Sequence, residues 1–198
     1  MAYHHGDLRR VLLETAAQMV EAEGPAALSL RAVARRAGVS HGAPARHFAD
    51  KAALLTAVAT EGMRAYHGAL TDALRQAGDS GLARARAAAV TYVRFTIEHP
   101  GASRLASHRE LFDAEDPAFA AAEQAVFELV RSTVAAAQRE GLAGDVDPTA
   151  LLIAIWSTLH GLAMLWLGGR LDHRLGRLDL STLIDQVVDF TIDSRVAG

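Results

Sequence analysis

The residues best suited to bind a charged ligand lie between Arg35 and Lys51, in the run RRAGVSHGAPARHFADK. Lys51 is the only lysine among the 198 residues, and it directly follows Asp50, a residue type that often caps a helix N-terminus. A cation at that end of a helix opposes the helix dipole, at a cost of a few tenths to about 1 kcal/mol. A phosphate would offset this cost and could also bind the free N–H groups of the helix end. We therefore expect Lys51 to bind a phosphate; the plainer alternative is a solvated lysine beside Asp50.

Charge is divided unevenly along the chain. Residues 1–51 hold seven Arg or Lys against five Asp or Glu, a net charge of +2, whereas the remainder holds thirteen against eighteen, a net charge of −5. This asymmetry favours the N-terminal part as the part that would bind a polyanion. The chain has no cysteine, which excludes disulfides and thiolate metal sites, and its first residues do not read as a secretory signal. We expect a cytoplasmic protein.

Apolar residues recur at helical spacing along nearly the whole chain, and no segment alternates as a strand would. The first apolar stripe starts at Leu8 and ends before Gly24-Pro25, a pair that stops a helix. Hydrophobic residues make up 51% of the chain, so the sequence predicts a folded, all-α protein. Ser29 is expected to cap a second helix over Leu30 to Ala37, and Ser40 to cap a short third helix. Asp50 is expected to cap a long fourth helix that runs to about Gln76. Further helices are expected over residues 82–98, 102–112, 117–140, 148–170 and 180–195.

Two short helices joined only by Gly38-Val39-Ser40 are typical of a helix-turn-helix motif. The longer segment LSLRAVARRAGVSHGAPARHFADKAALL, residues 28–55, resembles the DNA-binding head of the TetR family of bacterial repressors. The family pattern falls here on Ser29, Val33, Ala34, Ala37, Gly38, Val39, Ser40, His47, Phe48, Lys51 and Leu54. By motif the resemblance covers about the first sixty residues, and beyond them it is mainly one of architecture.

The resemblance implies a three-helix, helix-turn-helix DNA-binding domain in residues 1–50 and a helical effector-binding and dimerisation domain in residues 51–198. It implies a ligand-responsive transcriptional regulator that binds palindromic double-stranded operator DNA as a homodimer. The DNA-binding residues that we expect are Ser29, Ser40, His41, Gly42, Ala43, Arg46, His47 and Lys51. Three alternatives stay open: His41 is merely solvated, His47 packs against Phe48, and Pro44 only makes the turn rigid.

Ala45 departs from the family pattern, which usually has a phosphate-contacting tyrosine at this place. A lost hydrogen bond of this kind costs roughly 0.5–1.5 kcal/mol, so DNA binding is expected to be weaker or to depend more on Arg46 and His47. This departure supports a rival hypothesis, a helical small-molecule-binding protein or enzyme whose DNA-binding head is a vestige.

Residues 148–169 carry no Asp, Glu, Lys or Arg and are long enough to cross a bilayer. Ser157, Thr158 and His160 lie near the middle of this segment, and an apolar helix can equally be buried in a core, so we expect no membrane partner. In the TetR family the last two helices usually form the dimer interface, which the resemblance places on helices 148–170 and 180–195.

WSTLHG, residues 156–161, resembles a W-x-x-x-H-G motif of one TetR subgroup. Trp156 and His160 are four residues apart and share a helix face, so they either line a ligand pocket or only pack in the core. Aromatic residues could line an apolar cavity for a small apolar effector, or could simply fill the core. The ligand-binding candidates are Tyr66, Tyr92, Phe95, Phe112, Phe127, Trp156 and His160. The spacing of the histidines and serines predicts no metal site, catalytic site or cofactor.

Overall fold

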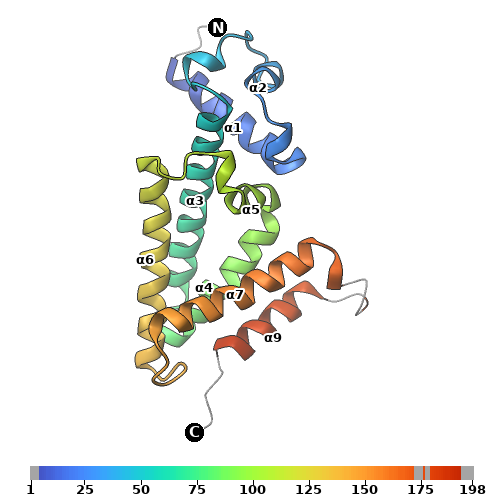
Figure 1. The fold of residues 1–198 in the computed structure, drawn as a ribbon. Helices are drawn as coiled ribbons and strands as arrows, with labels where there is room; N and C mark the ends of the chain where they lie inside the picture. The colour runs from blue at the N-terminus through green and yellow to red at the C-terminus, as the bar shows by residue number, and fades with distance from the viewer. Residues whose placement is uncertain (1–4, 172–175, 177–178, 193–198) are drawn as a thin grey trace. The chain divides into compact units, whose positions relative to one another are not determined.

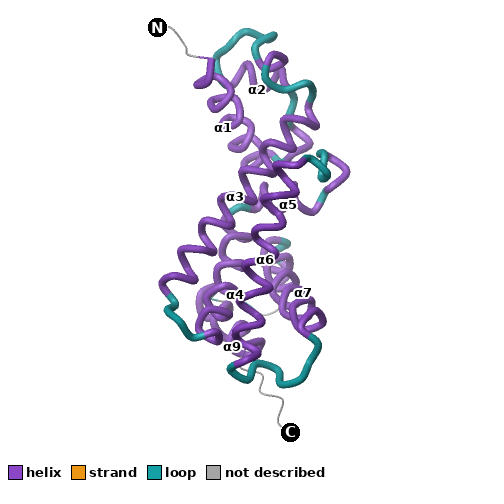
Figure 2. The backbone as a smooth tube through the Cα atoms, turned by 90° about the vertical axis from the view of Figure 1, so that its left-hand side faces the viewer, coloured by secondary structure: helices purple, strands orange, loops and turns teal. Residues whose placement is uncertain are grey.

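The computed structural model describes residues 5–171, 176 and 179–192, and within these ranges every regular element is helical (Figures 1 and 2). The α-helices are α1 His5–Glu23, α2 Leu30–Arg36, α3 Lys51–Gln76, α4 Gly81–Glu98, α5 Pro100–Ser107, α6 Pro117–Arg139, α7 Pro148–Leu167 and α9 Leu180–Ile192. Three short 3₁₀ helices lie between them, η1 Pro25–Ala27, η2 Pro44–Arg46 and η3 Arg109–Leu111. The all-α prediction is confirmed.

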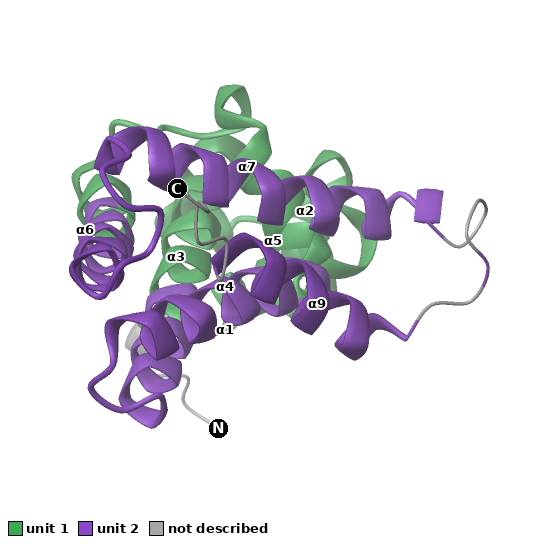
Figure 3. Ribbon diagram, turned by 90° about the horizontal axis from the view of Figure 1, so that it is seen from below, with its two compact units in different colours: residues 1–65, 99–123 green, residues 66–98, 124–198 purple. Residues whose placement is uncertain are grey.

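The chain forms two compact units, shown in different colours in Figure 3. Unit 1 comprises residues 1–65 and 99–123, and unit 2 comprises residues 66–98 and 124–198. Unit 1 therefore contains the expected DNA-binding head together with the first part of α3, all of α5 and η3, and the start of α6.

The core of unit 1 joins the head to α5. Leu12 of α1, Val33 of α2 and Leu105 of α5 are fully buried in one cluster, with Phe48 and Leu54 beside them. The carboxylate of Glu21 in α1 accepts hydrogen bonds from the backbone N–H groups of Gly101 (3.0 Å) and Ala102 (3.3 Å). These donors belong to the first turn of α5 and have no partner within their own helix, so Glu21 fixes where α5 begins against α1.

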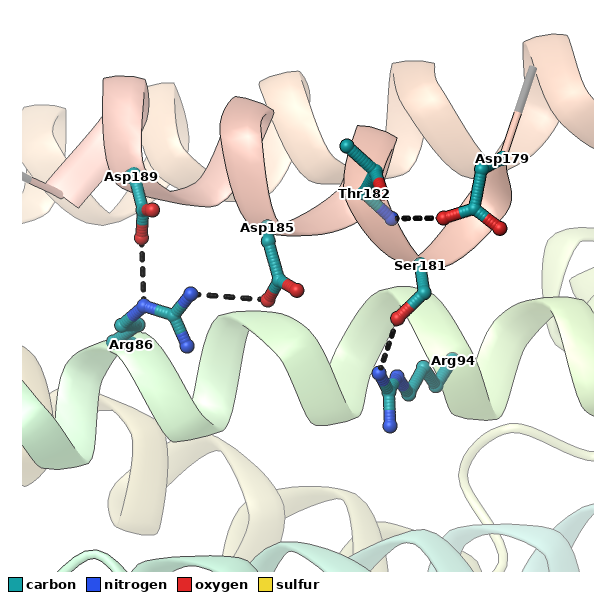
Figure 4. A network of polar contacts seen from close by, with 7 residues as sticks. All are labelled: Arg86, Arg94, Asp179, Ser181, Thr182, Asp185 and Asp189. Carbon is teal, nitrogen blue, oxygen red and sulfur yellow. Dashed lines mark hydrogen bonds and ion pairs between the residues drawn. The ribbon is translucent and has the colours of Figure 1, made fainter.

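In unit 2, α4 packs against both α7 and α9, which lie side by side. Val93, Leu159, Ile184 and Val188 are buried in this core. Polar contacts also join α4 to α9, as Figure 4 shows. Arg86 Nε donates to Asp189 at 2.6 Å and its Nη2 donates to Asp185 at 3.0 Å, while Arg94 Nη2 donates to Ser181 Oγ at 3.1 Å. Asp179 accepts from the Thr182 N–H at 2.8 Å and so caps the start of α9.

Several helix ends differ from the sequence predictions. Residues 102–112 do not form one helix, because α5 ends at Ser107 and His108 adopts non-helical angles (φ −116°, ψ 65°) before η3. Helix α7 ends at Leu167 rather than at residue 170, where Gly168 and Gly169 follow and Gly169 has a positive φ of 63°. Helix α9 is described as far as Ile192, and residues 193–195 of the expected helix lie outside the described residues.

Candidate functional site

Helix α2 begins where the sequence predicts, because Ser29 caps it. The Ser29 side chain accepts a hydrogen bond from the backbone N–H of Ala32 at 3.1 Å. The helix ends after Arg36, and Gly38 then takes a positive φ of 69°, which glycine adopts without strain. The tight turn at residues 38–40 is thus formed as expected.

The element after this turn is not the α-helix that the sequence predicted. The structure has only turns and η2 there, and Ser40 does not act as a side-chain cap. An α-helix capped by Ser40 needs the N–H of residue 44 to bond to the Ser40 carbonyl, and Pro44 has no N–H. The Ala43 N–H bonds to that carbonyl instead, at 2.9 Å, which gives the tighter i+3 spacing. Pro44 itself is fully buried, so it also anchors this segment in unit 1.

The eight expected DNA-binding residues all lie in unit 1, between Ser29 and Lys51. Five of them are exposed and three are partly buried. The exposed ones are Ser29, Ser40, His41, Gly42 and Arg46, and the partly buried ones are Ala43, His47 and Lys51. Ala45 is exposed as well, and Phe48, directly after His47, is buried in the core of unit 1.

Lys51 makes a contact that its sequence position did not suggest. Its Nζ donates a hydrogen bond to the carbonyl oxygen of Ala26 in η1, 3.1 Å away. Asp50 caps α3 as expected, because its Oδ1 accepts from the Ala53 N–H at 2.8 Å. An ammonium group has three donors, so the bond to Ala26 leaves Lys51 able to donate to a phosphate as well.

The arginines of the head divide into partnered and unpartnered groups. Arg36 forms an ion pair with Glu23 at 2.5 Å, and the Arg9 guanidinium lies 5.2 Å from the centre of the Phe48 ring. Arg31, Arg35 and Arg46 are exposed, and no hydrogen bond or ion pair joins their guanidinium groups to the residues that the structure describes. The sequence alone does not separate Arg31 and Arg35 from Arg36, because an unpaired arginine cannot be distinguished from a paired one without the structure.

Five of the seven ligand-binding candidates meet in unit 2. The Tyr66 ring of α3 lies 5.1 Å from the Phe95 ring and 6.0 Å from the Tyr92 ring of α4, measured between centroids. The Tyr92 hydroxyl oxygen lies 2.9 Å from His160 Nδ1 and accepts a hydrogen bond from Trp156 Nε1 at 3.0 Å. We call these five residues the aromatic cluster.

The Tyr92 hydroxyl contacts two other side chains of the aromatic cluster, those of Trp156 and His160. Trp156 Nε1 can only donate, and the Thr96 side chain also hydrogen bonds to Tyr92. Burial raises the pKa of Tyr92, although the bonds from Trp156 and Thr96 work against this rise. Which of the Tyr92 hydroxyl and His160 Nδ1 donates in their bond depends on the tautomer of His160.

Phe112 and Phe127 do not join the aromatic cluster. Phe112 belongs to unit 1, where it is buried with its ring 4.9 Å from the Phe119 ring. Phe127 lies on α6 in unit 2 and is 48% exposed. Unit 2 has two surface hollows of about 340 Å³ and 370 Å³, which share Asp79 and Arg84 in their walls, and no residue of the aromatic cluster lines either one. An apolar effector cavity therefore stays a prediction.

Helices α7 and α9 leave large apolar side chains uncovered. Helix α7 is long and apolar enough to cross a membrane, with a mean hydropathy of 1.8, but its buried residues, among them Ile155 and Leu162, form part of the unit 2 core. Only 22% of its most apolar window is buried within this single chain. The exposed side chains on the two helices are Ile153, Trp156, Leu165, Leu167 and Phe190, the last of which is 80% exposed.

Both parts of the chain match known protein families. Residues 12–58 match bacterial regulatory proteins of the tetR family, and residues 85–191 match the tetracyclin repressor-like C-terminal domain. These matches do not distinguish the subgroup with the W-x-x-x-H-G motif. A search of curated proteins found no match.

Solved structures are similar over nearly the whole chain. A protein of unknown function from Rhodococcus sp. RHA1 is 36% identical, with a TM-score of 0.82 over 98% of this chain and 96% of its own. A bacterial regulatory protein of the tetR family from Rhodococcus RHA1 is 19% identical, with a TM-score of 0.72 over 95% and 96% of the two chains. AibR, in complex with isovaleryl coenzyme A and operator DNA, is 18% identical, with a TM-score of 0.70 over 92% and 97%. At 19% and 18% identity, the similarity of this chain to the last two structures is a similarity of fold.

Proposed function

This chain belongs to the TetR family of bacterial regulatory proteins, and from that premise we propose that it binds a palindromic operator as a homodimer and responds to a small apolar effector. It is a ligand-responsive transcriptional regulator. We further propose that it acts in the cytoplasm as a repressor. The head of unit 1 would bind the operator, and the aromatic cluster of unit 2 would bind the effector.

The observation that carries the DNA-binding proposal is the set of unpartnered cations on the head. Arg31 and Arg35 lie on α2, and Arg46 lies in η2 just after the tight turn. Because no carboxylate of the described residues neutralises these three guanidinium groups, they can bind phosphates without first breaking an ion pair. Lys51 adds a fourth cation at the N-terminus of α3, where the free N–H groups also favour an anion.

The uncovered apolar face of α7 and α9 supports dimerisation through these helices. An apolar helix that is mostly exposed needs a second surface to cover it. A second copy of this chain would present the same face, and two paired helices from each copy would form a four-helix interface. A dimer also places two heads on one DNA duplex, which is how a helix-turn-helix protein binds a palindrome.

Helix α3 offers a route from effector to operator. Lys51 lies in its first turn, and Tyr66 lies further along the same helix in the aromatic cluster. An effector that displaces the Tyr66 ring would shift α3 and, with it, the spacing of the two heads in the dimer. AibR has been solved with both a coenzyme A thioester and operator DNA, which supports a small-molecule response in this fold.

The test of DNA binding is selection from a randomised duplex library with the purified protein at near-physiological salt. The proposal expects enrichment of a palindrome. The double variant Arg46→Ala/Lys51→Ala should bind the enriched duplex more weakly and with a smaller salt dependence. Arg75→Ala is the matched control, because Arg75 is an exposed arginine of unit 2 paired with Asp72. Salt-sensitive binding with no enriched sequence would instead favour the rival hypothesis of a vestigial head.

The test of the dimer is the molar mass of the protein in solution without detergent. Phe190→Asp puts a charge on the uncovered face of α9 and should produce monomers. Phe127→Asp is the matched control, because Phe127 is also exposed but lies on α6. A wild-type monomer, or two variants that dissociate equally, would contradict an interface on α7 and α9.

A further inference from the structure

Asp79 and Arg84 stand in the walls of both surface hollows of unit 2. The end of α3, the start of α4 and the second half of α6 supply the rest of these walls. The volumes of about 340 Å³ and 370 Å³ lie at the lower end of the range for small-molecule sites, about 300–1,000 Å³. The hollows are therefore large enough for a polar ligand with a few carbon atoms.

Close packing and hydrogen bonds hold the walls of the hollows in place. A Cβ built at Gly81 would lie 2.6 Å from the backbone carbonyl carbon of Ala136, so the start of α4 and the end of α6 approach closely. Glu140 directly follows α6 and accepts hydrogen bonds from the backbone N–H groups of Gly81 and Leu82 and from the Ser80 hydroxyl. All of these residues belong to unit 2, so one compact unit frames both hollows.

Two arginines of the second hollow have no counter-ion in the described part of the chain. No hydrogen bond or ion pair joins the guanidinium groups of Arg84 and Arg139 to any residue there. Glu140 lines the same hollow, but both of its carboxylate oxygens already accept hydrogen bonds from the start of α4. Arg84 stands in the first turn of α4, where a cation opposes the helix dipole, so its charge does not stabilise the helix. The two guanidinium groups are thus available to an external anion.

The same walls also carry unused acceptors. The Asp79 carboxylate forms no ion pair with Arg84 or with any other described residue, although both side chains line both hollows. The hydroxyls of Thr71 and Ser132 donate their own hydrogens to the carbonyl oxygens of His67 (2.8 Å) and Leu129 (3.0 Å). Toward a ligand these hydroxyls can only accept. A ligand that fits both kinds of group carries an anion and, beside it, hydrogen-bond donors.

We propose that the two hollows form a ligand site for a small phosphate monoester that carries hydroxyl groups. Arg84 and Arg139 bind the phosphate, and Asp79 accepts hydrogen bonds from the hydroxyls. A phosphate monoester carries about −1.5 to −2 charges at pH 7, which two guanidinium groups balance, and their planar shape matches the phosphate oxygens. This site goes beyond the proposed function, because it is separate from the head and from the aromatic cluster and takes a polar ligand.

The test follows the backbone amide NMR spectrum of the full chain while glycerol 3-phosphate, inorganic phosphate or glycerol is added at constant ionic strength. Glycerol 3-phosphate should shift the resonances of residues 78–84 and 132–140 saturably. It should bind about 2- to 10-fold more tightly than inorganic phosphate, which has no glycerol hydroxyls for Asp79, and glycerol should not bind. Equal affinities of the two phosphates, binding of glycerol, or no saturable shift in these two segments would overturn the inference.

Arg84→Gln and Arg139→Gln each remove one charge and should each weaken the binding of glycerol 3-phosphate by at least about 3-fold. Both variants should melt near the wild-type temperature, because neither guanidinium group has a bonded partner among the described residues. Arg131→Gln is the matched control, because Arg131 is an exposed arginine of α6 that is paired with Glu128 at 2.7 Å and lines neither hollow. Unchanged affinity in the first two variants, or an equal loss in the control, would contradict the assignment of the phosphate to Arg84 and Arg139.

Asp79→Ala tests the acceptor separately. Asp79 is exposed in the loop between α3 and α4, so the substitution leaves the core intact. The variant should still bind inorganic phosphate but should lose the preference for glycerol 3-phosphate over it. A preference that survives in Asp79→Ala would show that Asp79 does not bind the hydroxyls, and the ligand class proposed for the site would be wrong.

The cations of the head are the other place where a phosphate can bind. Arg46→Ala/Lys51→Ala should remove any shifts within residues 29–51 and should leave the shifts at the hollows unchanged. Shifts confined to residues 29–51 in the wild type would reject the site in unit 2 and would leave the DNA-binding proposal in place. Selection of a palindrome does not depend on this site, so Arg84→Gln should bind the enriched duplex as tightly as the wild type does.

Discussion

The ammonium group of Lys51 donates a hydrogen bond to the carbonyl oxygen of Ala26, 3.1 Å away. This bond connects the first residue of α3 with η1, the segment that joins α1 to α2. Lys51 therefore has a structural contact inside unit 1 in addition to the phosphate contact expected from its position. The two roles can be separated, because one needs only a donor and the other needs a charge.

We expect Lys51→Gln and Lys51→Met to differ in stability but not in DNA binding. Glutamine can still donate to Ala26, whereas methionine cannot, and the site is partly exposed, so Lys51→Met should lower the free energy of unfolding by at most about 1 kcal/mol. Both variants lose the charge, so the slope of log affinity against log salt should fall by about 0.9 in each. Denaturant unfolding and operator titrations at several salt concentrations measure the two effects. An unchanged salt slope would show that Lys51 contacts no phosphate and has only its structural role.

Ala45→Tyr should strengthen operator binding. Ala45 is exposed in η2, between the buried Pro44 and the unpartnered Arg46, so a tyrosine ring can be added there without entering the core. A restored hydroxyl-to-phosphate hydrogen bond is worth roughly 0.5–1.5 kcal/mol, or about 2- to 13-fold in affinity. Ala45→Phe is the control, since it adds the ring without the hydroxyl. Equal affinities for the two variants would mean that residue 45 does not reach a phosphate.

The sequence predicted the helical class, the caps at Ser29 and Asp50 and the tight turn at Gly38, because each depends on residues close together in the chain. It did not predict the loss of the third helix. Pro44 lies four residues after Ser40, where an α-helix capped by Ser40 would need its first intrahelical N–H, and proline has none.

The candidate effector site was only partly predictable. Residues on one helix face, such as Trp156 and His160, were paired correctly by their spacing, and they share the Tyr92 hydroxyl. Phe112 was grouped with them by residue type alone. It is buried in unit 1 because the chain turns at His108, and no local signal marks which core an aromatic side chain will enter.

Gly101→Ala should destabilise the protein. A Cβ built at Gly101 would lie 2.4 Å from the Glu21 Cα and 2.4 Å from the Val20 carbonyl oxygen, so α1 and α5 would have to separate. Overpacking of this kind costs typically about 1–3 kcal/mol, and the separation would also weaken the bonds from Glu21 to the first turn of α5. Denaturant unfolding measures the loss.

The matched control for Gly101 is Gly68→Ala. Gly68 is also helical, but open space surrounds the position where its Cβ would lie. Alanine is the better helix former by about 0.5–1 kcal/mol, so this variant should be more stable than the wild type. If both variants changed stability in the same direction, the close approach of α1 and α5 would not be the cause.

Glu140 should make the stability of unit 2 depend on pH in the acid range. Its carboxylate accepts hydrogen bonds from the backbone N–H groups of Gly81 (2.6 Å) and Leu82 (3.1 Å), and from the Ser80 hydroxyl (2.9 Å). These bonds, first of all the one from Gly81, lower the pKa of Glu140 below its ordinary value of 4.5. Glu140 thus stabilises the start of α4 whenever it is ionised.

Because the folded state has the lower pKa, the stabilisation by Glu140 is present above the unfolded value and is lost as the pH falls through the folded value. Glu140→Gln should therefore lower the melting temperature at pH 7, and the difference from the wild type should shrink as the pH falls below about 4.5. Asp145→Asn, which neutralises an exposed loop carboxylate, is the control and should change the melting temperature little at either pH. A difference between Glu140→Gln and the wild type that stayed constant from pH 7 to pH 3 would show that the charge of Glu140 does not hold the start of α4.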